Sequence, residues 1–168
     1  MKIPVNKDNQ IIFRRANLSD KNDSVKIIEL LELFSLESSV NRPLDIKIKK
    51  SLIENLRNFS NTIVYLAIFN SDPIGIAVCF KGFSTFKNSL LINIHDFYIR
   101  KDYQRKGIGS DFLDFIELDV KKIGFCRMTL EVNSHNKKAL KLYEKKGFCG
   151  NKDRDNKKIM FAMSKDLI

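Results

Sequence analysis

The chain contains few of the residues that mark fibrous, disordered or disulfide-rich proteins. Its 168 residues include only 3 prolines and 7 glycines against 43% hydrophobic residues, which excludes collagen-like and low-complexity classes and favours a packed core. The 3 cysteines are odd in number and form no C-x-x-C pair, so neither a disulfide framework nor a zinc knuckle is indicated. We expect a reducing, cytoplasmic setting and one domain over residues 1–168, with its core at about 11–165.

Long hydrophobic runs are also missing. The longest nearly apolar run, residues 62–69, is far shorter than the roughly 20 residues that span a bilayer. The first eight residues lack the apolar stretch of a signal peptide. The sequence therefore predicts no insertion into a membrane.

Acidic residues are outnumbered, since 30 Lys and Arg stand against 20 Asp and Glu and give a net charge of +10. Such an excess suits nucleic acid, phosphorylated cofactors or membrane surfaces. No RNP-like segment or recognition helix is present, and few basic residues cluster with aromatic ones, which argues against nucleic acid. Phosphorylated cofactors and membrane surfaces stay open as anionic partners.

Hydrophobic periodicity predicts a mixed α/β fold of order β-α-α-β-β-β-α-β-α-β-β. Its sheet is mostly antiparallel, and a β-α-β crossover through residues 90–133 places a parallel pair in the middle. The expected strands cover residues 11–16, 62–69, 74–80, 90–99, 128–133, 148–152 and 158–165. The expected helices cover 25–37, 45–59, about 108–123 and 135–146.

Local signals mark the ends and faces of these helices. Asp23 and Ser24 are expected to cap the first helix, Ser134 the last, and Gly124 to end the third. The second helix should bury a stripe of apolar residues. This stripe comprises Ile46, Ile48, Leu52, Ile53 and Leu56.

The segment Gln104–Ser110 lies between a strand and a helix and carries Gly107 and Gly109. Glycines allow close approach of the backbone to a ligand, and the free amides of a helix start favour an anion such as pyrophosphate. The dinucleotide pattern G-x-G-x-x-G fails at Phe112, and no G-K-[ST] Walker loop occurs. Taken alone, the segment is better explained as an ordinary turn with solvated cations than as an anion site.

A second motif follows one strand later, where residues 133–148 read N-S-H-N-K-K-A-L-K-L-Y-E-K-K-G-F. Together with Q-x-x-G-x-G at 104–109, this resembles the GNAT superfamily of acyl-CoA-dependent N-acyltransferases over nearly the whole chain. The segment 83–86 with the strand that follows it is similar to the polyamine-acetyltransferase branch, which carries a glutamate at the position of His95.

The resemblance implies acetyl-CoA as acetyl donor and no metal. Amides of Arg105–Ser110 would bind the pyrophosphate, and main-chain groups of Phe97–Ile99 would pair with the pantetheine arm, which Asn136 would also contact. A bulge near Phe97–Ile99 would splay the fourth and fifth strands. The implied cofactor-binding residues are Phe97, Tyr98, Ile99, Gln104, Arg105, Lys106, Gly107, Ile108, Gly109, Ser110, Asn133, Asn136 and Tyr143.

The same resemblance places Tyr143 as the general acid that protonates the departing thiolate, although it could be only a half-buried helix aromatic. The acceptor amine needs a base, for which His95, Glu131 and a water chain stay open. Strand alternation predicts His95, Phe97 and Ile99 on one face of the sheet, with Asp96 and Tyr98 on the other.

We therefore expect direct acetyl transfer to the primary amine of a small molecule or a protein. The acceptor would lie against residues 25–59, residues 82–89 and the terminal hairpin, where Glu37 and other acids of the first helix could offset the basic surface. The alternative is a non-catalytic module that binds acyl-CoA or associates with nucleic acid. Homodimers are frequent in the superfamily, but no feature of the sequence identifies an interface.

Overall fold

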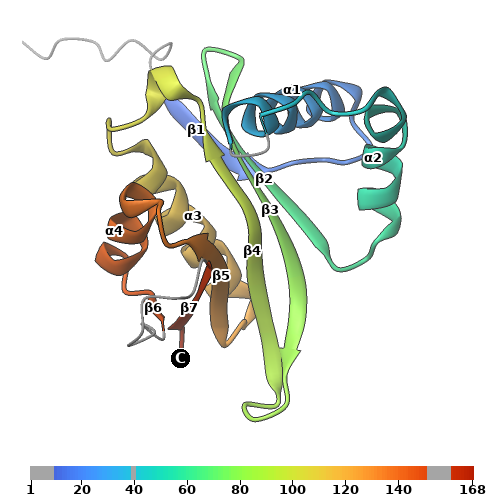
Figure 1. Ribbon diagram of the computed structural model, residues 1–168. Helices are drawn as coiled ribbons and strands as arrows, with labels where there is room; N and C mark the ends of the chain where they lie inside the picture. The colour runs from blue at the N-terminus through green and yellow to red at the C-terminus, as the bar shows by residue number, and fades with distance from the viewer. Residues whose placement is uncertain (1–9, 39–40, 151–159) are drawn as a thin grey trace, which may run out of the picture.

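A computed structural model describes residues 10–38, 41–150 and 160–168. The elements follow the predicted order, with one added 3-10 helix, η2 (Lys101–Tyr103), after the fourth strand (Figure 1). The strands are β1 (Ile11–Arg15), β2 (Thr62–Phe69), β3 (Asp72–Ser84), β4 (Ser89–Ile99), β5 (Arg127–Asn133), β6 (Cys149–Gly150) and β7 (Met160–Asp166). The helices are α1 (Lys21–Glu37), α2 (Ile46–Asn58), α3 (Ile108–Ile123) and α4 (Lys137–Lys145).

The strands form one seven-stranded sheet of order β1-β2-β3-β4-β5-β7-β6. The β4–β5 pair is parallel because α3 carries the chain back between the two strands, and the other pairs are antiparallel. The predicted mixed sheet with a central parallel pair is confirmed. The predicted pairing of the last two strands is present between β6 and β7, and residues 151–159, over which the expected strands 148–152 and 158–165 extend, lie outside the described residues.

Helices cover both faces of the sheet, with α1 and α2 on one side and α3 and α4 on the other (Figure 1). Each side has its own hydrophobic cluster. Ile27 and Leu30 of α1 pack with Val78 and Tyr98 on the first side. Phe112 and Ile116 of α3 belong to the larger cluster on the second side. Side chains of β4 therefore contact either cluster according to the face they occupy.

The first helix begins four residues earlier than predicted. Asp20 is the N-cap, and its side chain accepts a hydrogen bond from the amide of Asp23. Asp23 is only 3% exposed and does not cap the helix, because its carboxylate accepts two hydrogen bonds from Arg14, at 2.6 and 2.7 Å, and one from the amide of Asn17. A tertiary ion pair thus decides which aspartate starts the helix.

Two further helix expectations are corrected. On α2, Leu56 is buried and Leu52 and Ile53 are partly buried, but Ile46 is 66% exposed and Ile48 is 48% exposed, because the first turn extends past the sheet-facing core. On α4 the N-cap is Asn136 rather than Ser134. The helix therefore spans Lys137–Lys145 and not 135–146.

Candidate active site

A cavity of about 1050 Å³ opens where β4 and β5 separate. The two strands pair only from Leu91–Ile94 to Arg127–Leu130 and then diverge, as the ribbon shows (Figure 1). The predicted splay is therefore present. Residues of β4, β5, α1, α4 and the loop before α3 all line this cavity.

A bulge in β4 lies at His95, not at Phe97–Ile99 as predicted. Val78 pairs with Asp96 and the next residue, Cys79, pairs with Ile94, so His95 is the extra residue. An extra residue shifts the side-chain alternation of everything that follows it. The alternation predicted across His95 is consequently wrong.

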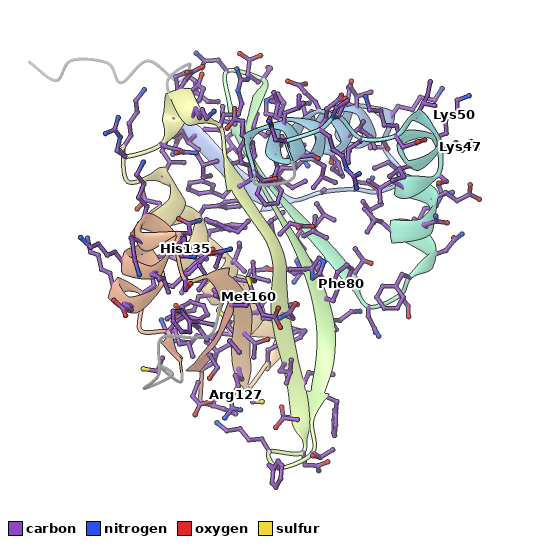
Figure 2. The ribbon with its side chains drawn as sticks, in the orientation of Figure 1. Lys47, Lys50, Phe80, Arg127, His135 and Met160 are labelled. Atoms are coloured by element: carbon purple, nitrogen blue, oxygen red, sulfur yellow. The ribbon has the colours of Figure 1, made fainter. Side chains whose placement is uncertain are left out.

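The side chains on either side of this bulge point to opposite faces of the sheet. The ring of His95 lies 5.3 Å from that of Phe80, which extends from β3 on the side of α2 (Figure 2). The ring of Phe97 instead lies 5.7 Å from Phe112 and 6.3 Å from Tyr143, on the side of α3 and α4. Both His95 and Phe97 line the cavity, but from different walls.

Past the bulge, one edge of β4 faces the cavity without a strand partner. The amide of Arg100 donates to the carbonyl of Ile74 on β3 at 2.9 Å. Because peptide groups alternate along a strand, those of Tyr98 also face β3, whereas those of Phe97 and Ile99 face the gap. The carbonyl of Ile99 accepts a hydrogen bond from Gln104 Nε2 at 2.7 Å. The peptide group of Phe97 is thus placed to pair with an extended ligand.

The loop before α3 has the geometry of an anion site. Arg105 and Gly107 have φ values of 61° and 85°, and α3 begins at Ile108. The first amides of a helix have no partner within it, and the helix dipole there favours negative charge. Gln104, Arg105, Gly107, Gly109 and Ser110 line the cavity.

Two predicted residues of this loop have side chains elsewhere. Ile108 is buried in the core on the α3 side, and the ammonium of Lys106 lies 5.4 Å from the ring centroid of Tyr103. Neither residue lines the cavity. Any part they take in binding phosphate would be through their backbone amides.

Asn133 and Asn136 line the cavity at the start of α4. The side-chain oxygen of Asn133 accepts a hydrogen bond from the amide of His135, and that of Asn136 from the amide of Ala139. Their side-chain amide groups keep N–H donors for a ligand. His135 is exposed beside α4 (Figure 2) and also contributes to the cavity wall.

Tyr143 is 6% exposed and packs edge-on against Phe97 and Phe148. Burial raises the pKa of its phenol to about 12, so the group keeps its proton through the neutral range. A buried phenol that borders the cavity can donate a proton there.

The opposite wall contains residues that no sequence motif marked. Phe34 and Glu37 at the end of α1 line the cavity, as does Ser38. Glu131, a base candidate, lines it from β5. Helical periodicity places Phe34 on the apolar side of α1, but only the sheet topology brings this end of the helix to the β4–β5 gap.

The expected acceptor-binding segments are corrected in part. Residues 82–89 form the turn end of the long β3–β4 hairpin, away from the gap (Figure 1), and none of them lines the cavity. α2 also contributes none of the lining residues. Of the first two helices, α1 alone reaches the site.

Within the described residues, no group of three or more His, Cys, Asp or Glu side chains is gathered in a way that could hold a metal ion. No described helix is both long and apolar enough to cross a membrane.

Residues 27–148 match the acetyltransferase (GNAT) family. The chain belongs to this family. The topology and the position of the cavity agree with that membership, and several solved structures share the fold.

Three of these structures show how widely the fold is used. The NatC complex bound to Gag peptide and CoA contains a chain with a TM-score of 0.71 and 19% identity, over 95% of this chain and 99% of that one. A putative acetyltransferase from Salmonella typhimurium with acetyl-CoA has a TM-score of 0.69 and 18% identity, over 95% of each chain. An aminoglycoside acetyltransferase from an uncultured soil sample, in complex with sisomicin, has a TM-score of 0.68 and 21% identity. The match covers 80% of this chain and 86% of that one.

Proposed function

We propose that the protein is an acetyl-CoA-dependent N-acetyltransferase that acetylates a primary amine by direct attack within a ternary complex. The observation that carries the proposal is the single cavity at the β4–β5 gap. It joins an anion-binding helix start and an open strand edge to a separate wall built from α1 and β5.

The donor side of the cavity fits an extended molecule with a pyrophosphate at one end. Amides at the start of α3 would hold the pyrophosphate, and the peptide group of Phe97 would pair with the pantetheine arm. Acetyl-CoA supplies an activated acyl thioester when it is bound. An N–H of the β4 edge that faces the gap can stabilise negative charge on the thioester oxygen.

Direct transfer is favoured over a covalent acyl-enzyme by the cysteines of the described chain. Cys79 and Cys126 are buried, and Cys149 is exposed on β6. None of them lines the cavity, and burial raises the pKa of the Cys79 thiol, which disfavours the nucleophilic thiolate.

Proton transfer is assigned to groups on opposite walls. His95 or Glu131, directly or through water, accepts the proton of the attacking amine. Tyr143 donates a proton to the thiolate as it departs, since its phenol borders the cavity and is protonated at neutral pH.

The acceptor would be the amine of a small molecule or a protein. The relatives described above were solved with a peptide in one case and an aminoglycoside in the other, and both ligands are amine-bearing molecules. The fold alone does not choose between them, and the similarity of residues 83–86 to the polyamine branch adds a third class.

The decisive experiment measures release of CoA thiol from acetyl-CoA over a panel of amines, with wild type and Tyr143→Phe. We expect kcat to fall by about 10² to 10⁴ in the variant, because a positioned acid contributes about that much, while CoA affinity is largely kept.

Tyr103→Phe is the matched control, because Tyr103 packs against Phe69 outside the cavity and should keep wild-type turnover. Tight CoA binding without turnover on any amine would contradict the proposal and favour a non-catalytic acyl-CoA-binding module.

A further inference from the structure

The charged residues that line the cavity are segregated by sign, with the cations and the acids on different elements. The cations come from the loop after β4 and from α4, and they are Lys101, Arg105, Lys138 and Lys145. The acids are Glu37, at the end of α1, and Glu131, on β5. Within the described residues, neither glutamate forms an ion pair with a lysine or arginine. The wall away from the phosphate site is therefore negatively charged in an otherwise basic protein.

A buried hydroxyl that lacks a hydrogen bond of normal geometry lies beside Glu37. Tyr98 lines the cavity, is 6% exposed, and stacks on Phe34 with ring centroids 5.5 Å apart. Its hydroxyl oxygen makes no hydrogen bond of normal geometry within the described chain. Burial and the nearby carboxylate of Glu37 both raise the pKa of this phenol. A buried polar group left unpaired is destabilising, and a ligand that hydrogen-bonds to it would relieve that penalty.

The position of Glu37 on its helix strengthens the attraction for a cation. Glu37 is the last residue of α1, and the final carbonyl groups of a helix carry partial negative charge. The aromatic rings of Phe34 and Tyr98 form an adjoining wall, and aromatic faces also attract cations. A carboxylate, a helix C-terminus and two rings all favour the same kind of ligand group.

We propose that Glu37 and Tyr98 form a subsite for a second cationic group on the acceptor, so that the preferred substrate is an amine with at least two positive charges. One amine would be acetylated next to His95 and Glu131. The other would donate hydrogen bonds to the carboxylate of Glu37 and the hydroxyl oxygen of Tyr98. This inference rests on the proposed N-acetyltransferase function and names its substrate class.

The test compares cadaverine, a five-carbon diamine, with pentylamine as acceptors. Wild type should prefer the diamine in kcat/KM, and Glu37→Gln should reduce that preference about tenfold, chiefly through KM for the diamine. Tyr98→Phe keeps the stacked ring but removes the hydroxyl, so it should reduce the preference to a smaller extent. The preference should be unchanged in Glu32→Gln, a control on the same helix whose carboxylate pairs with Lys49 outside the cavity.

Calorimetric titration of cadaverine into wild type and Glu37→Gln, with and without CoA, separates this inference from the proposed function. Weaker diamine binding in the variant supports the subsite even if no amine is turned over. An equal diamine preference in wild type and Glu37→Gln, or no preference in wild type, would overturn the subsite while leaving acetyl transfer intact.

Discussion

Gly109 is a residue at which an added methyl group should affect ligand binding more than folding. A Cβ built there would lie 3.6 Å from Leu142 and 3.7 Å from Ile99 and Phe97, which are ordinary packing distances. Its φ is not in the left-handed region, in contrast to Gly107 at 85°. The fold therefore does not require glycine at 109, whereas the proposed close approach of a phosphate to the start of α3 would.

Gly109→Ala should thus weaken CoA binding at least tenfold while changing the free energy of unfolding by less than about 1 kcal/mol. Calorimetric titration with CoA and urea unfolding measure the two quantities. Gly107→Ala is the contrasting variant, since its left-handed backbone should lower stability by roughly 1 kcal/mol. CoA affinity in Gly109→Ala equal to that of wild type would mean that phosphate does not approach this turn.

His95 offers a second prediction for a single residue, because the bulge turns its side chain toward the acceptor wall. A primary ammonium with a pKa near 10.4 is mostly protonated at neutral pH and needs a base. His95→Ala should lose rate mainly below about pH 8 and much less above it, as measured by kcat/KM across pH. A pH–rate profile unchanged by the substitution would leave Glu131 or water as the base.

Among the elements, α1 is held to β1 by one buried carboxylate. Asp23 joins Arg14 of the strand and the backbone of Asn17 to the first turn of the helix. The hydrogen bonds from Arg14 lower the pKa of Asp23 against the opposing effect of burial. Because the far end of the same helix carries Phe34 and Glu37, this anchor also fixes the part of the cavity wall proposed to bind the acceptor.

Asp23→Asn should lower the free energy of unfolding by about 1–2 kcal/mol at pH 7, since the half-exposed Arg14 and the amide of Asn17 lose charge-assisted hydrogen bonds to a buried carboxylate. A depressed folded-state pKa stabilises the fold above the unfolded value near 3.9, and that contribution is lost as pH falls through the folded pKa. Urea unfolding from pH 7 down to pH 3 should show the difference shrinking below about pH 4.

Glu32→Gln is the control for this series, because its partly exposed pair with Lys49 should contribute at most about 1 kcal/mol. The assigned ion pair would be contradicted if the difference in free energy of unfolding between wild type and Asp23→Asn stayed constant down to pH 3.

For the molecule as a whole, the element order could be predicted because each element carries its own hydrophobic period. The caps could not. Asp20 and Asp23 are both acceptable N-caps by sequence, and the choice depends on Arg14, which meets Asp23 only after β1 and α1 are packed. Asn136 and Ser134 are another such pair of candidates.

The acceptor side of the site was the least predictable part. Its donor side follows from the motifs at 104–110 and 133–148, which are local in sequence. The bulge at His95 was missed because strict alternation assumes an uninterrupted strand, whereas one extra residue reverses the face of all that follow it. Glu37 reaches the cavity only through the order of strands in the sheet, which no single segment encodes.

The short β4–β5 pairing gives the sheet an edge in its interior. Edge strands usually invite pairing with other chains, and proteins blunt them with charge, bulges or covering elements. Here the edge beyond Ile94 runs between helices of both layers (Figure 1), which cover it as covering elements protect other edges. The protein can therefore keep a strand edge open for an extended ligand with little risk of aggregation through it.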